Sequence, residues 1–108
     1  MEQLTVIEKE GANYKLYDLE GALNAYTMGE FQKKLWEDVA EINVVLDMSK
    51  ITELAPSGIG VLMAAFNDAE EAGTKLYFMA MSNEASIAIN NTGFKNLFNI
   101  ITAVTEIK

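Results

Sequence analysis

The hydrophobic and polar positions along the chain follow two spacings, one typical of strands and one typical of helices. Apolar and β-branched residues at 4–9 and 14–19 predict two strands, and the turn signal at 11–13 joins them into a hairpin. Gly21 is expected to end the second strand. From residue 14 onward, predicted strands and helices alternate, which indicates an α/β layered fold.

Apolar residues spaced one helical turn apart predict the first two helices. Phe31, Leu35 and Val39 form one apolar face, behind a capping-box pattern that begins at Thr27. The second helix is expected to begin at residue 56 or 57 and to extend to about residue 72. Gly73 then stops it in a left-handed conformation.

Shorter apolar runs complete the pattern. Residues 43–47, 76–79 and 98–101 predict three more strands, giving a small mixed sheet of four to five strands. A third helix is expected from a Ser82 cap through residue 91, with Gly93 in a left-handed turn behind it. Residues 1–108 are interpreted as one domain.

The second predicted helix is apolar on nearly all sides, which leaves two interpretations open. Its other face, at Gly60, Val61 and Ala64, is small and uncharged. A helix that is apolar all round is typical of a buried element, but a small flat apolar face is also typical of a docking surface. The residues assigned to its core face are Ile59, Leu62, Met63 and Phe66.

Composition argues against several classes of function. The chain has 8 basic and 16 acidic side chains and a net charge of −8, so it would repel a phosphate backbone and direct nucleic-acid binding is not expected. It has no cysteine and no histidine, which removes the thiol nucleophile, the imidazole proton shuttle and the commonest metal ligands. With neither a signal-peptide pattern nor a long apolar run, a cytoplasmic protein without membrane insertion is expected.

Candidate catalytic residues lack the partners that catalysis requires. Asp47 and Glu53 flank the segment before the second helix, but their spacing in sequence fixes no distance between the carboxylates. Ser57 has no histidine base and lies outside a Gly-x-Ser-x-Gly elbow. Gly58 and Gly60 lack the rest of a dinucleotide or phosphate-loop motif, and are interpreted as positions where the first turn can approach the sheet or a partner closely. No catalysis, cofactor or metal is therefore predicted.

Four segments match the motifs of one known family, in order and at compatible spacing. Residues 21–24 (Gly-Ala-Leu-Asn) match Gly-Glu-Leu-Asp, and residues 44–49 (Val-Val-Leu-Asp-Met-Ser) match Val-Leu-Asp-Leu-Ser. Residues 56–62 (Pro-Ser-Gly-Ile-Gly-Val-Leu) fall on Asp-Ser-Ser-Gly-Leu-Gly-Val-Leu, and residues 92–100 match a closing Gly-x-x-x-x-Phe-x-Ile stretch. The chain therefore resembles STAS domains, the fold of bacterial anti-sigma factor antagonists.

The resemblance implies a mixed sheet with helices packed mainly on one face and a protein-binding function without catalysis. Such proteins bind an anti-sigma factor, often a serine kinase, and thereby release a sigma factor for transcription. The kinase phosphorylates the first serine of Asp-Ser-Ser-Gly. The phosphate abolishes binding, because it adds about −1.5 to −2 units of charge and bulk to a small apolar contact.

This chain departs from the family pattern at the switch itself. Ala55 and Pro56 fall on the aspartate and the phosphorylated serine, and Asn24 replaces the aspartate before the first helix. Proline has no hydroxyl, so the usual phosphoserine switch is predicted to be missing. Ser57 remains as the candidate phosphoacceptor, or as a hydroxyl bonded to local backbone.

The expected partner is a serine-kinase-like anti-sigma factor, bound by a monomer or weak dimer. Two alternatives stay open: a STAS subunit that regulates a lipid-transport ATPase, and a sensing module that holds a nucleotide or lipid near Ser57. The predicted contact residues surround the start of the second helix: Asn24, Leu54, Ala55, Pro56, Ser57, Gly58, Gly60, Val61 and Ala64.

Overall fold

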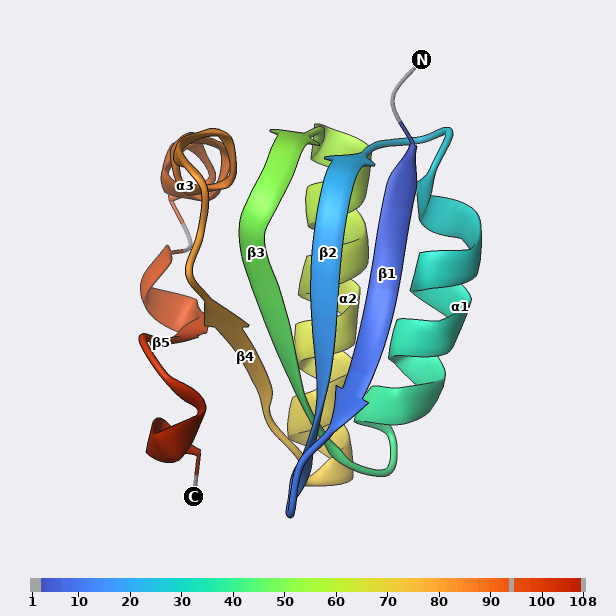
Figure 1. Ribbon diagram of the computed structural model, residues 1–108, viewed down its shortest axis with the longest axis vertical. Coiled ribbons are helices and arrows are strands. Elements are labelled where there is room, and N and C mark those ends of the chain that lie inside the picture. Colours follow the sequence, from blue (N-terminus) through green and yellow to red (C-terminus); the bar gives the residue numbers. More distant parts are fainter. Residues whose placement is uncertain (1–2, 94, 108) are drawn as a thin grey trace.

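A twisted five-stranded sheet organises the molecule (Figure 1). The computed structural model describes residues 3–93 and 95–107. The order of strands across the sheet is their order along the chain: β1 (Leu4–Glu10), β2 (Tyr14–Leu23), β3 (Asn43–Leu54), β4 (Leu76–Met79) and β5 (Asn99–Ile101). β1 and β2 form the predicted antiparallel hairpin, and the remaining pairs are parallel. The predicted mixed α/β sheet is confirmed.

Two of the three α-helices within the described residues cover one face of the sheet. The helices are α1 (Met28–Val39), α2 (Pro56–Ala72) and α3 (Asn83–Asn91). α1 and α2 pack side by side against the sheet, and α3 packs against the part of β3 that extends beyond β4 (Figure 1). Two short 3-10 turns, Lys95–Leu97 and Val104–Glu106, flank β5. None of the helices within residues 3–93 and 95–107 combines the length and apolar character that crossing a bilayer requires.

The main core lies between the sheet and the pair α1 and α2. The apolar face predicted for α1 is buried, since Phe31, Leu35 and Val39 all belong to this core. Gly73 and Gly93 have φ angles of 81° and 75°, as predicted for left-handed helix ends. A second, smaller cluster of buried side chains lies on the opposite face of the sheet: Val45, Tyr77 and Ile101.

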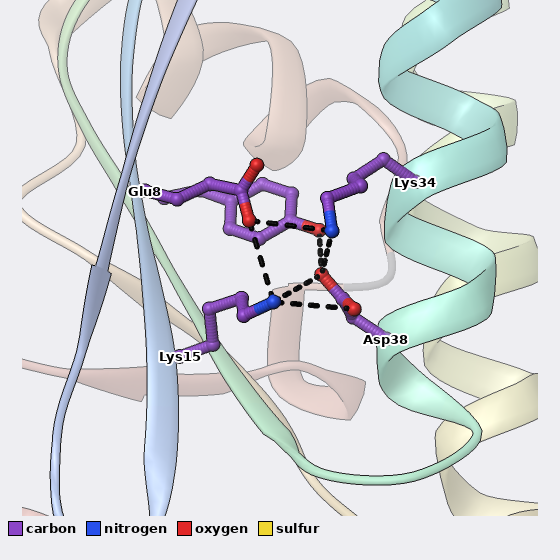
Figure 2. A network of polar contacts seen from close by, with 5 residues as sticks. Glu8, Lys15, Lys34 and Asp38 are labelled. Atoms are coloured by element: carbon purple, nitrogen blue, oxygen red, sulfur yellow. Dashed lines mark hydrogen bonds and ion pairs between the residues drawn. The ribbon is translucent and has the colours of Figure 1, made fainter.

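A network of polar side chains connects the β1–β2 hairpin to α1 (Figure 2). Lys15 Nζ lies 3.4 Å from Glu8 Oε1 and 3.5 Å from Asp38 Oδ2, and Lys34 Nζ lies 3.4 and 3.6 Å from the same two atoms. The buried Tyr17 donates its phenolic hydrogen to Asp38 Oδ2. The Asp38 carboxylate on α1 thus contacts side chains from the hairpin, Lys15 and Tyr17, and from α1 itself, Lys34.

β2 and β3 both extend further than the sequence predicts. β2 continues through Gly21 to Leu23, so Gly21 does not end the strand as predicted. It lies at a shift in the pairing register with β3 and has a φ angle of 111°. A Cβ atom there would lie 1.9 Å from the Gln3 carbonyl oxygen, so only glycine fits this close approach. β3 was expected to end at residue 47 but pairs with β2 as far as Leu54, leaving Ala55 alone between strand and helix.

The capping box predicted at the start of α1 is wrong. Thr27 occupies the N-cap position, but its side chain makes no cap hydrogen bond. Its hydroxyl instead donates to the Ala22 carbonyl oxygen at 2.7 Å and accepts from the Asn24 amide at 3.0 Å. The hydroxyl is used to shape the connection between β2 and α1, so it is not available to the first turn of the helix. The Ser82 cap of α3 is present, since its hydroxyl accepts from the Ala85 amide at 3.1 Å.

Candidate functional site

The carboxyl ends of β2 and β3 lie side by side and bring two loops together. Leu23 and Leu54 are paired at the last position of the two strands. The Ala55 amide then donates to the Leu23 carbonyl oxygen at 3.0 Å, which holds the start of α2 beside the end of β2. The predicted contact residues on both loops therefore share one edge of the sheet, which lies at the top of Figure 1.

Asn24 fixes the shape of the β2–α1 loop. Its Nδ2 donates to Glu53 Oε1 at 2.8 Å, across to β3, and its Oδ1 accepts from the Tyr26 amide at 2.9 Å. Its carbonyl oxygen also accepts the amides of Thr27 and Met28. Because these bonds use both ends of the side-chain amide, Asn24 acts as a structural link between the two loops as well as a surface residue.

The first turn of α2 carries a proline in place of a hydroxyl. Pro56 occupies the first helical position, where its fixed φ fits and its missing N–H costs nothing. Ala55 precedes it in an extended conformation and gives the helix no side-chain cap. The side-chain hydroxyl of the half-buried Ser57 makes no hydrogen bond to any of the described residues. The local backbone bond that was one interpretation of Ser57 is therefore not formed here.

The two glycines of α2 have different surroundings. A Cβ atom on Gly58 would lie 2.7 Å from both the carbonyl oxygen and Cγ of Leu23, so the close approach predicted there is present. A Cβ atom on Gly60 would meet nothing within 4 Å, and Gly60 is exposed. Gly60 therefore makes no close approach to the sheet, and for this glycine only close approach by a partner stays a prediction. Gly58 lets α2 start against β2, whereas Gly60 leaves an open spot on the helix surface.

Three of the predicted contact residues lie in the interior. Leu54 is 7% exposed, Val61 is 4% exposed, and Gly58 faces Leu23. Both interpretations of α2 therefore apply, to different residues, because Val61 belongs to the core while Gly60 and Ala64 reach the surface. We call the accessible remainder the rim surface: Asn24, Ala55, Pro56, Ser57, Gly60 and Ala64.

Sequence reasoning missed Tyr26, which lies on the same edge. Its side chain is 80% exposed, the largest exposed fraction among the large hydrophobic residues that the structure describes. The signal was present, since an aromatic residue in a predicted loop next to a proposed contact residue has no core to enter. The family motif did not identify Tyr26, because the matched segment, residues 21–24, ends before it.

The two carboxylates considered for catalysis serve local structure. Asp47 Oδ1 accepts the Ser49 amide at 3.0 Å, and Glu53 holds Asn24. Within residues 3–93 and 95–107, no three acidic side chains gather in a way that could hold a metal ion.

A cavity of about 560 Å³ lies between β1 and α1 and includes Thr27 of the β2–α1 loop in its lining. Its walls include apolar residues such as Val6 and Phe31 and members of the Lys34 and Glu8 pair. No residue of the rim surface lines it. The prediction of a small-molecule site near Ser57 therefore gains no support from this cavity.

The sheet is mixed, its strands follow one another in chain order, and two helices cover one face. α2 begins just after β3, at the position of the family's phosphorylated serine. These features define a small α/β domain of the STAS type. The STAS domain family model matches residues 3–107, so the chain belongs to the STAS domain family. The suspected resemblance is confirmed.

Solved structures with the same fold include anti-sigma factor antagonists. A Thermotoga maritima protein assigned to that class has a TM-score of 0.82 and 12% identity, covering 94% of this chain and 89% of that one. An anti-sigma factor antagonist from Mycobacterium paratuberculosis has a TM-score of 0.78 and 17% identity, covering 95% and 89%. Unphosphorylated SpoIIAA, also named an anti-sigma factor antagonist, has a TM-score of 0.78 and 11% identity, covering 95% and 93%. At these identities the likeness shows the shared fold.

Proposed function

We propose that this STAS domain binds a serine-kinase-like anti-sigma factor through the rim surface and so regulates transcription without catalysis. Membership of the STAS family and the names of its structural neighbours support this class of function. The observation that carries the proposal is the rim surface itself, a small uncharged patch at the start of α2. The protein would act in the cytoplasm, as a monomer or weak dimer.

The geometry of α2 supports docking at this position. Gly58 packs against Leu23 and the Ala55 amide bonds to the same residue, so the first turn is held in place before any partner arrives. Gly60 and Ala64 lie one turn apart on the same side of the helix and carry almost no side chain. A preformed surface of small residues lets a partner approach the backbone closely, with little side-chain entropy to lose on binding.

A charge placed on the rim surface at Ala64 should abolish binding. Ala64→Glu places a carboxylate, bulkier than the native methyl group, where the partner is expected to lie. We expect at least a roughly 30-fold rise in Kd, as for the loss of a central interface contact. Binding to purified anti-sigma factors of the source organism would be measured by isothermal titration calorimetry.

Ala72→Glu is the matched control for this change. Ala72 is exposed at the far end of α2, so the same substitution there adds the same charge away from the rim surface. Circular dichroism of both variants reports whether the fold is kept. Equal affinities for the wild type and for a folded Ala64→Glu variant would contradict the assignment of the surface.

We further propose that the chain lacks the phosphoserine switch at the family's usual position. Pro56 offers no hydroxyl there, and the neighbouring Ser57 is only half exposed. When incubated with ATP and a serine-kinase-like anti-sigma factor that binds it, the wild type should gain no phosphate on residues 55–60. Pro56→Ser restores a hydroxyl at the usual position and should become phosphorylated, which also shows that the kinase is active.

Mass spectrometry of the peptide spanning residues 50–75 reads out this experiment. Pro56→Ala is the control, because it removes the ring without adding a hydroxyl. Phosphate found on Ser57 of the wild type would refute the missing switch and identify Ser57 as its substitute acceptor. The same anti-sigma factor preparations are used in the binding assay. A pull-down followed by mass spectrometry tests the alternative partner, a lipid-transport ATPase.

A further inference from the structure

Tyr26 presents an aromatic ring to solvent from a loop with a fixed backbone. Its side chain is 80% exposed, yet its amide is held by Asn24 Oδ1 at 2.9 Å. The next two amides, of Thr27 and Met28, both bond to the Asn24 carbonyl oxygen at 3.2 and 3.1 Å. A tyrosine on a rigid backbone has only two side-chain torsions to order on binding, so it offers a large contact area at a low entropic cost.

The loop that carries Tyr26 is linked directly to the rim surface. Asn24, two residues earlier, belongs to that surface and is bonded to Glu53 on β3 at 2.8 Å. Ala55, at the start of α2, is bonded to Leu23 at 3.0 Å. An exposed aromatic residue that stands alone on a surface needs no explanation. This one lies beside a patch of small uncharged residues, where an interface needs an anchor.

The segments that form this edge carry charge of a single sign. Residues 16–32 and 51–74, which form the end of β2, the start of α1 and all of α2, contain no lysine or arginine. Along the sequence, the charged residues that come closest to the two loops are exposed carboxylates, Glu30 in the first turn of α1 and Glu53 at the end of β3. The uncharged patch therefore has an acidic border, and complementary charge on a partner would be basic.

We infer that Tyr26 is the aromatic anchor of the partner interface, and that it enters an apolar pocket bordered by basic residues on the bound protein. This inference rests on the proposed function, since it names the chemistry of the partner at the same surface. The ring supplies buried apolar area at the centre of binding. Glu30 and Glu53 steer the approach of the basic border and accelerate association.

Truncation of the ring tests the anchor. Tyr26→Ala should raise the Kd for the anti-sigma factor that binds the wild type by roughly 30-fold, as expected of an aromatic hot spot. Tyr26→Phe keeps the ring and should stay within about threefold of the wild type. Since the side chain is 80% exposed, both variants should unfold at the same temperature as the wild type.

Ile7→Ala is the control for loss of an exposed apolar side chain elsewhere. Ile7 is 51% exposed on β1 and should be neutral for binding. If Tyr26→Ala binds the anti-sigma factor as tightly as the wild type does, Tyr26 is not the anchor, but the proposed function still stands. If none of the purified anti-sigma factors binds the wild type, the proposed function and the anchor fail together.

A second pair of variants tests the basic border on the partner. The double variant Glu30→Gln with Glu53→Gln removes two charges from the acidic border of the rim surface. The new amide oxygen at residue 53 can still accept the hydrogen bond from Asn24. The association rate measured at low salt should fall by roughly tenfold, and its dependence on ionic strength should weaken. Glu70→Gln with Glu71→Gln changes the net charge equally at the far end of α2, and should leave both properties near wild type. Equal rates for the two pairs would overturn the basic border.

Discussion

Two glycines in the same helix show how one residue type serves different purposes. Gly58 lies where α2 meets the end of β2, and a Cβ atom there would be 2.7 Å from the Leu23 carbonyl oxygen. That oxygen accepts the Ala55 amide, so moving it would disturb the bond that positions the helix start. Gly60 has open space around it. The motif in the sequence makes the two look equivalent, and only the packing separates them.

We expect alanine to destabilise the protein at one of these positions and to stabilise it at the other. Gly58→Ala should lower the free energy of unfolding by about 1–3 kcal/mol, because the added methyl group overpacks against a backbone atom. Gly60→Ala should raise it by up to about 1 kcal/mol, because alanine favours a helix interior and nothing obstructs its methyl group. Urea denaturation followed by the fluorescence of Trp36 measures both.

The Trp36 signal suits this comparison because its indole Nε1 donates to the Val61 carbonyl oxygen at 3.4 Å, between α1 and α2. The wild type is the reference for both variants. If Gly58→Ala were as stable as Gly60→Ala, the close contact with Leu23 would not be what requires glycine at residue 58.

At the scale of elements, the sequence predicts a helix or strand well where burial follows one regular period. α1 was predicted from its buried residues, spaced four apart, and the short strand β4, which lies between β3 and β5, from an unbroken apolar run. The second half of β3 escaped prediction because its buried residues, Met48, Ile51 and Leu54, are spaced three apart. That spacing reflects the register shifts between β2 and β3, which sequence periodicity does not reveal.

The candidate site was predicted in position but not in detail. Family motifs identified the start of α2 and the Asn24 loop, and the structure brings these two segments to one edge. Sequence could not tell that Val61 faces the core while Gly60 faces solvent, because every neighbour on that helix is apolar. Nor could it foresee that the Thr27 hydroxyl bonds to Ala22, since that contact depends on where β2 ends. Residue type alone does not decide such competition between local hydrogen bonds.

At the scale of the whole molecule, the network around Asp38 pairs two ammonium groups with two carboxylates in a chain with a large excess of acidic side chains. The chain carries a net charge of −8, and two of its eight basic residues, Lys15 and Lys34, contact Glu8 and Asp38. The contacts that Asp38 makes with Lys15 and Tyr17 join the hairpin to α1, so they form only when the two have assembled (Figure 2). Tyr17 is the fully buried member, and its hydroxyl has the Asp38 carboxylate as its acceptor.

Burial, together with the hydrogen bond to the Asp38 carboxylate, raises the pKa of Tyr17 well above its usual value near 10. In the unfolded chain the phenol has its ordinary pKa of about 10. Below that pH the phenol is neutral in both states and the contribution of Tyr17 to stability is complete. Above it, the unfolded chain loses the proton while the folded protein keeps it, so stability falls as pH rises.

The advantage of the wild type over Tyr17→Phe should therefore be constant between pH 7 and 9 and decline above pH 10. The variant should be less stable by about 1 kcal/mol on the plateau, since Asp38 loses a hydrogen bond. From about pH 10.5 the difference should shrink by up to about 1.4 kcal/mol per pH unit, the limit for one proton. Urea denaturation at each pH measures it, and the plateau serves as the internal control. If the stability difference between the wild type and Tyr17→Phe stays constant to pH 11.5, Tyr17 ionises alike in the folded and unfolded states. The buried phenol would then not couple the folding of the hairpin and α1 to proton binding.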